Sequence, residues 1–84
     1  MIKPLRYTLH AETVIRERGL NKSWIENTVR QPDWRIPAPE DKDIARLYRH
    51  ISERGDRILR VACLENVEEI RIISAFFDRK ARRP

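Results

Sequence analysis

The spacing of apolar residues in the first third of the chain predicts a short helix. Between residues 9 and 18 the apolar positions recur three and four residues apart, as on one face of an α-helix. The apolar residues Ala11, Val14 and Ile15 form this stripe, and Arg18 continues the same helical face. Thr8 suits the N-cap, because its hydroxyl can accept a hydrogen bond from a free backbone N–H, and Gly19 can adopt the left-handed conformation that ends a helix. The first helix is therefore expected at residues 9–18.

A second helix is predicted to follow with almost no linker. Asn21 suits its N-cap, and Pro32 ends it because proline lacks the N–H that a helix requires. Its stripe consists of Trp24, Ile25, Thr28 and Val29. Two helices so close together also suit a DNA-reading helix–turn–helix. Trp24 and Ile25, however, favour a position facing a core over one facing a DNA groove.

After residue 33 the pattern changes from helical spacing to alternation, which predicts strands. A short edge strand interrupted by proline is expected in DWRIPAPE, followed by strands in DIARLYRHIS, ILRVACLE and IRIISAFF. Short turns, with Gly55 at one tip and NVEE in the other, predict that the last three form an antiparallel meander. Because helices precede strands, we expect an α+β fold with two N-terminal helices packed on one face of a four-stranded antiparallel sheet.

The whole chain, residues 1–84, is expected to form a single domain. A chain this short buries only about 60% of its unfolded surface and supports one modest core. The folded core is expected over residues 7–77. The residues before Tyr7, which include Pro4, are interpreted as a lead-in, and residues 78–84 as a basic tail that frays.

Alternation along the strands separates a core face from an open face. The core face is expected to contain Leu47, Leu59, Val61, Cys63, Ile70, Ile72 and Phe76. The open face then contains Arg46, Tyr48, His50, Arg60 and Arg71. A face that combines arginine, which binds phosphates, with tyrosine, which stacks on bases, has a composition that suits RNA. The alternative is that these are the ordinary polar residues of a solvated sheet face, paired across strands.

Cysteine content and hydropathy restrict the class of protein. The single Cys63 excludes an internal disulfide and a cysteine-rich zinc site, and it fits a reducing compartment. No stretch reaches the roughly 20 apolar residues that cross a bilayer, and the N-terminus lacks an apolar signal core. We therefore expect a soluble, cytoplasmic protein with no membrane partner.

The charge balance indicates a class of partner. The formal net charge is +5, and most of the basic residues are arginines. Arginine presents a planar fork that pairs with phosphate and stacks on bases. Nucleic acid is therefore the natural partner, although a solvated surface of mixed charge would have the same composition.

The N-terminal stretch HAETVIRERGLNKSWIENTVRQPD resembles the opening of domain-of-unknown-function family 4258. The matching residues are His10, Ala11, Arg18, Gly19, Leu20 and Pro32. RILRVACLE and IRIISAFF are similar to the paired strands of that family, with Arg60 in its LRV position, and RIISA also resembles the last strand of BrnT-type toxins. The resemblance extends over residues 7–77. It departs at Thr13 and Val14, where the family opening often has Arg-Met, so a basic residue that the resemblance would place at the site is missing.

Both groups are similar to the RelE/ParE toxin superfamily, and this resemblance implies a function. It implies a toxin-like protein of a toxin–antitoxin system that cleaves RNA as a metal-independent endoribonuclease, with RNA as substrate and a cognate antitoxin protein as partner. Two alternatives remain open. One is a non-catalytic module that binds protein or nucleic acid on the same fold, and the other is a ParE-like inhibitor of gyrase. A fold alone does not decide among them.

RNA cleavage without a metal requires a base for the 2′-hydroxyl and cations for the phosphate. The catalytic candidates are His10 and His50 for proton transfer and Arg60 and Arg71 for the phosphate. The candidate nucleic-acid-binding residues are Arg46, Tyr48, Arg79, Lys80, Arg82 and Arg83, of which Tyr48 could stack on a base or transfer a proton. No histidine spacing suits a metal, so no metal or cofactor is expected. Cys63 alternates with core residues and is expected to be a buried apolar side chain.

His10 has an unusual place in the first turn of the first predicted helix. The partial positive charge of a helix N-terminus disfavours imidazolium and favours the neutral ring that a general base needs. The alternative is that His10 only orders the contact between helix and sheet. If His10 is the base, His10→Ala abolishes cleavage without affecting folding. The basic tail likewise has two interpretations: a segment that binds phosphate or an acidic antitoxin, or a disordered solubilising end.

Overall fold

Both helices begin and end at the residues that their capping signals predict. In the computed structural model, which describes residues 2–84, helix α1 spans Leu9–Arg18. The hydroxyl of Thr8 accepts a hydrogen bond from the backbone N–H of Ala11 at 3.1 Å, and Gly19 ends the helix with φ 63°. Glycine reaches this conformation without the steric cost that a side chain would add.

Helix α2 spans Lys22–Arg30. The side chain of Asn21 caps it by accepting from Ser23 N–H at 2.8 Å. Ile25 is fully buried, as expected for a core-facing residue. Thr28 is also fully buried, and its hydroxyl donates to the carbonyl of Trp24 at 2.7 Å, so no polar group is left without a partner there.

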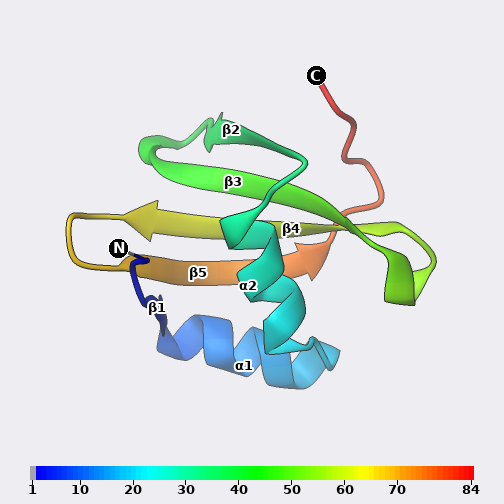
Figure 1. Ribbon diagram of the computed structural model, residues 1–84, viewed down its shortest axis with the longest axis horizontal. Coiled ribbons are helices and arrows are strands. Elements are labelled where there is room, and N and C mark those ends of the chain that lie inside the picture. The colour runs from blue at the N-terminus through cyan, green and yellow to red at the C-terminus, as the bar shows by residue number, and fades with distance from the viewer. Residues whose placement is uncertain (1) are drawn as a thin grey trace.

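The sheet has five strands rather than four, and it is mixed rather than antiparallel. The strands are β1 (Leu5–Tyr7), β2 (Trp34–Ala38), β3 (Asp41–Ile51), β4 (Arg57–Glu65) and β5 (Ile70–Phe77). Their spatial order is β1-β5-β4-β3-β2 (Figure 1), and β1 pairs in parallel with β5. The prediction of a four-stranded antiparallel sheet was wrong because it missed β1. The three residues of β1 follow a proline and are too few to show alternation, and the strand that pairs with β1 is the last strand of the chain.

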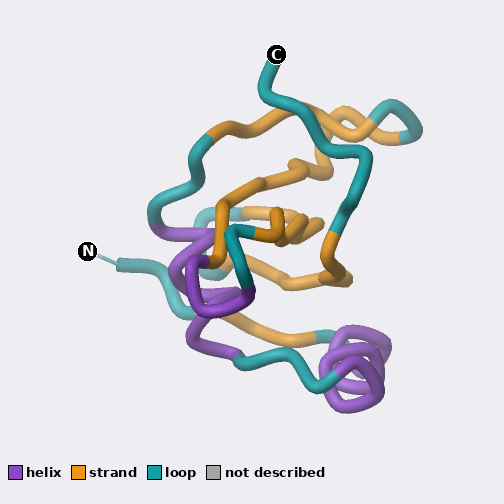
Figure 2. Tube along the Cα trace, turned by 90° about the vertical axis from the view of Figure 1, so that its right-hand side faces the viewer, coloured by secondary structure: helices purple, strands orange, loops and turns teal. Residues whose placement is uncertain are grey.

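The two helices lie against different parts of this sheet (Figures 1 and 2). Helix α2 packs on β3 and β4, while α1 packs along β5 and β1. Between helices and sheet is one core, whose fully buried members include Ala11, Ile25, Leu59, Val61 and Ile72. The predicted α+β class and the single packed face are therefore confirmed. Within the described residues, neither helix is long and apolar enough to cross a membrane.

An irregularity in β5 changes which phenylalanine enters the core. Cys63 pairs with Ile72 whereas Ala62 pairs with Ser74, so Ile73 has no partner in the register. An extra residue of this kind reverses the faces of everything that follows it. Phe77 consequently packs on the core, and Phe76 pairs with Arg60 on the open face. The prediction that Phe76 lies under the helices was wrong for this reason.

A tight turn joins β3 to β4. It contains one turn of 3₁₀-helix, η1 (Ser52–Arg54), followed by Gly55 with φ 66°. The next residue, Asp56, also has a positive φ of 59°, and its N–H donates to the carbonyl of Ile51 at 3.0 Å. The predicted turn at Gly55 is confirmed, and it presents Arg54 and Arg57 at this end of the sheet.

The C-terminal segment after β5 folds back over the sheet instead of extending away from it. The backbone N–H of Asp78 donates to the carbonyl of Ile58 at 2.8 Å. Further along, the guanidinium of Arg83 donates to the carbonyl of Asp33 at 2.9 Å. Residues 78–84 therefore connect the end of β5 to the start of β2, unlike the frayed tail that their composition predicted.

Cys63 is buried, as its alternation with core residues predicted. The residue is 4% exposed, and burial raises the pKa of its thiol to about 11. Since the thiolate is the reactive form, we expect Cys63 to resist alkylation by iodoacetamide at pH 8 in the native protein. It should react at the rate of a free thiol in 6 M guanidinium chloride, which mass spectrometry would show. Equal rates in both conditions would contradict this burial.

Candidate nucleic-acid interface

The sheet face opposite the helices contains all five residues that alternation assigned to it. Arg46, Tyr48 and His50 follow one another at every second position of β3. In the strand register Arg60 is opposite Tyr48, and Arg71 is opposite Leu64. Residues that are opposite one another in an antiparallel pair point to the same side. The predicted open face is therefore a real surface, although its members differ in their surroundings.

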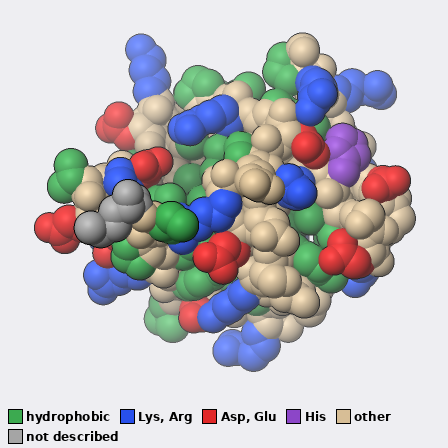
Figure 3. Space-filling model, viewed as in Figure 1, with side chains coloured by type: hydrophobic (Ala, Val, Ile, Leu, Met, Phe, Trp, Pro, Cys, Tyr) green, Lys and Arg blue, Asp and Glu red, His purple; other side chains and the backbone are tan. Residues whose placement is uncertain are grey.

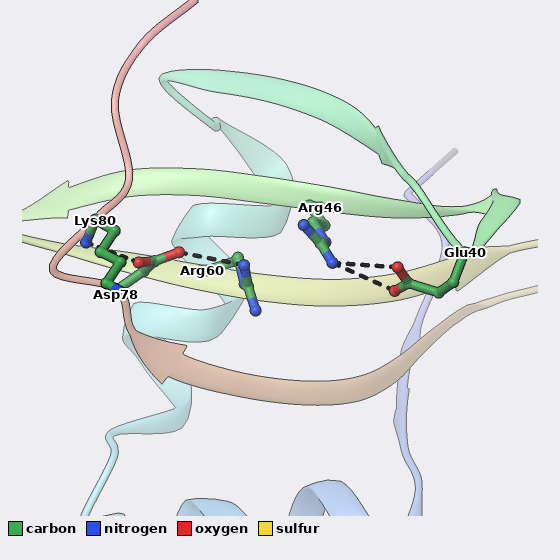
Figure 4. A network of polar contacts seen from close by, with 5 residues as sticks. All are labelled: Glu40, Arg46, Arg60, Asp78 and Lys80. Atoms are coloured by element: carbon green, nitrogen blue, oxygen red, sulfur yellow. Dashed lines mark hydrogen bonds and ion pairs between the residues drawn. The ribbon is translucent and has the colours of Figure 1, made fainter.

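Arg60 lies at the centre of this face and is held from two sides. Its guanidinium is 3.2 Å from the carboxylate of Asp78, as Figure 4 shows. On its other side it is stacked 4.2 Å from the ring centroid of Phe76. The Asp78 carboxylate also accepts from the backbone N–H of Lys80 at 2.9 Å. Arg60 is thus fixed in orientation, and part of its charge is already neutralised.

The other two arginines of the open face are also paired with acids. Arg46 approaches both carboxylate oxygens of Glu40 at 3.3 Å (Figure 4). Arg71 is 3.5 Å from Glu69, which also lies 3.6 Å from Arg6. Exposed pairs of this kind are weak, worth about 0–1 kcal/mol, so a phosphate can compete for these arginines. The open face is nevertheless less basic than its arginines alone suggested.

Tyr48 is unavailable as a stacking platform because Trp34 covers it. The two rings are stacked with centroids 4.8 Å apart and planes at 7°, and Tyr48 is only 4% exposed. The prediction that Tyr48 stacks directly on a base, or transfers a proton, does not fit this burial. The cross-strand partner Trp34, on β2, is half-buried and is the aromatic side chain nearer to solvent.

A histidine oriented by an aspartate lies beside this aromatic pair. The carboxylate of Asp33 accepts from the backbone N–H of His50 at 2.8 Å and is 3.0 Å from His50 Nδ1. The imidazole side chain is 48% exposed and lies edge-on to Trp34, with centroids 6.2 Å apart. With Nδ1–H donating to Asp33, the lone pair of Nε2 is directed away from the aspartate and can accept a proton.

Asp33 is suited to this orienting role. Its pKa is lowered from the usual 3.8, first by the hydrogen bond from the backbone N–H of His50 and then by the hydrogen bond with the His50 ring. The carboxylate is therefore ionised at neutral pH and remains an acceptor. Sequence reasoning missed Asp33, yet one signal was available: a hairpin register that pairs Trp34 with Tyr48 brings residue 33 close to His50.

Arg83 completes the cluster from the C-terminal segment. Its guanidinium carbon is 5.7 Å from the ring centroid of Trp34, and it donates to the backbone carbonyl of Asp33. A cation is therefore placed next to the Asp33–His50 pair. Of the other predicted tail residues, Arg79 lines a surface cavity with Arg57 and Phe77, while Lys80 and Arg82 are exposed.

His10 lies apart from this cluster. It is exposed in the first turn of α1, and within the described residues no hydrogen bond to its ring is found. Helix α1 packs along β5, whereas His50 belongs to β3, so β4 and β5 lie between them. Two strand spacings already amount to about 10 Å. The two histidines therefore cannot act together on one phosphodiester as base and acid.

The helix side of the molecule shows no segregation of charge. In the view of Figure 3, Lys and Arg side chains are interspersed with Asp and Glu over the whole visible surface. The net charge of +5 is thus not concentrated in one large patch on that side. Selective binding of nucleic acid then depends on local clusters in which arginines lack acidic neighbours.

Comparison with known proteins gives a family without an assigned activity. The chain matches the family described as "Domain of unknown function (DUF4258)" over residues 7–77, and it belongs to that family. The resemblance seen in the sequence is thereby confirmed. No curated protein and no solved structure gave a match.

Proposed function

We propose that this protein is a toxin-like, metal-independent endoribonuclease whose catalytic base is His50. The observation on which the proposal rests is the Asp33–His50 pair, a half-exposed imidazole held at 3.0 Å by an ionised carboxylate. An imidazole oriented through one nitrogen and free at the other is what proton abstraction by a general base requires. His50 is preferred to His10 because, within residues 2–84, an orienting partner and a neighbouring cation are found for His50 and no hydrogen bond to the ring is found for His10.

The proposed reaction uses groups that lie around His50. Nε2 takes the proton of a 2′-hydroxyl, the 2′-oxygen bonds to phosphorus, and the bond from phosphorus to the 5′-oxygen breaks. The leaving 5′-oxygen takes a proton from water, and the products end in a 2′,3′-cyclic phosphate and a 5′-hydroxyl. Arg83, and Arg60 when it exchanges Asp78 for substrate, would stabilise the charge on the phosphorane. Trp34 would support a neighbouring base by stacking.

The partner proposed for such a protein is a cognate antitoxin that covers the open face. The mixed character of this face supports the proposal, since apolar Ile36, Ile44 and Leu64 are only half-buried there, between the arginines. A protein that binds the face would bury these side chains and exclude RNA from His50. Co-expression with the product of an adjacent small gene, followed by co-purification, tests this part of the proposal.

A non-catalytic binding module is the second candidate, and one observation favours it. Arg60 and Arg46 are already bound by Asp78 and Glu40, which suits a structural role better than phosphate stabilisation. Incubation of RNA with the protein in EDTA separates the two candidates. The nuclease yields shortened RNA, whereas a binding module retards the RNA in a gel and leaves its length unchanged.

A further inference from the structure

A group of arginines that the proposed reaction does not use surrounds the end of β5. Arg18 at the end of α1, Arg54 in η1 and Arg57 at the start of β4 line one surface cavity of about 300 Å³ together with Leu20 and Phe77. Three separate elements thus contribute an arginine to one cavity beside Phe77. We call this group the arginine cavity.

Aromatic rings hold these arginines in place. The guanidinium carbon of Arg57 is 4.5 Å from the ring centroid of Phe77, and that of Arg54 is 5.5 Å from the same ring. Arg54 is also 5.8 Å from the Trp24 centroid, and Arg18 is 5.6 Å from Phe76. A guanidinium stacked on a ring directs its N–H donors outward in its own plane, where they can bind an anion.

Unlike Arg46, Arg60 and Arg71 of the open face, these arginines form no ion pair with an acid in the described part of the chain. Within residues 2–84, none of the ion pairs includes Arg18, Arg54 or Arg57. All three residues are exposed. No carboxylate lines the cavity. Of the two acids in the adjoining turn, Glu53 accepts from the Ser52 hydroxyl at 3.2 Å, and Asp56 lines a neighbouring cavity with Arg57. The cavity itself is therefore lined by three cations that form no ion pair within residues 2–84, although Asp78 also lines the neighbouring cavity beside Arg57.

The arginine cavity and the Asp33–His50 pair lie at the same end of the sheet, on opposite faces. In the β3–β4 register Ile58 is opposite His50, and the next pair joins Arg57 to Ile51. Because neighbouring residues of a strand point to opposite sides, His50 faces the open side and Arg57 the helix side at the same end of the sheet. An RNA strand bound at His50 can pass round this end to reach Arg57.

We infer that the arginine cavity is a second phosphate-binding site, which takes a backbone phosphate of the RNA next to the segment that is cut. The inference rests on the proposed RNA-cleaving function, and it specifies where the RNA strand continues beyond the cleavage site. Stacked, unpaired guanidiniums bind phosphate bidentately and regardless of base. The site therefore increases affinity for longer RNA and contributes nothing to the choice of base.

The test compares two double variants with equal loss of charge in their binding to a 2′-O-methyl oligoribonucleotide, which cannot be cleaved. Arg54→Ala/Arg57→Ala removes the cavity arginines, and Arg16→Ala/Lys42→Ala removes two exposed cations elsewhere. The first variant should bind about 10-fold more weakly and should reduce the slope of log K against log salt by about 1, as expected for one or two lost single-strand phosphate contacts. The control should stay within about twofold of the wild type.

A conservative variant separates a structural effect from a loss of binding. Arg54→Lys/Arg57→Lys keeps both charges but cannot bind phosphate bidentately, so its affinity should be intermediate while its melting temperature stays that of the wild type. Equal affinities and slopes for the alanine variant and the control would overturn the second site alone. Failure of the wild type to bind the oligonucleotide would overturn both this site and the proposed function.

Discussion

Replacement of His50 by alanine is expected to lower the rate of RNA cleavage by about 10²–10⁴-fold, the usual contribution of a general base. The fold should survive, because the backbone N–H of His50 keeps its 2.8 Å hydrogen bond to Asp33 when the ring is removed. Initial rates on a fluorescent oligoribonucleotide in EDTA measure the effect. Circular dichroism on the same samples verifies folding.

The matched control is the same substitution at the other histidine. His10 is exposed and has no hydrogen-bonded partner among the described residues, so His10→Ala should cleave RNA within about threefold of the wild type. The opposite outcome, with His10→Ala inactive and His50→Ala unaffected, would move the base to α1 and refute the role given to the Asp33–His50 pair.

The second large effect concerns stability. Leu59 is completely buried in β4, which lies in the middle of the sheet between β5 and β3. Leu59→Ala should lower the free energy of unfolding by about 2–5 kcal/mol, since it removes apolar contacts and leaves a cavity. A domain of this size has only about 5–15 kcal/mol of stability, so much of the total is lost. Urea denaturation followed by tryptophan fluorescence measures the change.

Leu9→Ala provides the comparison for that measurement. Leu9 is 85% exposed at the start of α1, so its truncation should change the free energy of unfolding by no more than about 0.5 kcal/mol. A loss below about 1 kcal/mol for Leu59→Ala would show that the core of β4 is packed differently from the structure described.

Local signals were sufficient to predict both helices and four of the five strands. Thr8, Asn21 and Gly19 act through hydrogen bonds and backbone angles within a few residues, so the sequence contains all the information needed. Strand β1 could not be predicted in the same way. Its three residues become a strand only because β5, at the other end of the chain, offers them an edge.

The candidate site shows the same limit. The open face of β3 followed from alternation, and His50 was identified with it. Alternation could not show that Asp33, Trp34 and Arg83 lie beside His50. Their positions depend on how β2 and the C-terminal segment fold against β3. The unpaired Ile73 likewise exchanged Phe76 and Phe77 between faces, because one extra residue changes a register that strict alternation assumes.

The most direct test of the account is the chemical nature of RNA ends produced in EDTA. Wild-type protein is incubated with a defined oligoribonucleotide, and mass spectrometry identifies the 3′ ends of the products. The account predicts fragments with a 2′,3′-cyclic phosphate from the wild type and from His10→Ala, and at least about 10²-fold less from His50→Ala. Intact RNA after incubation with the folded wild-type protein, or equal cleavage by His50→Ala, would contradict it.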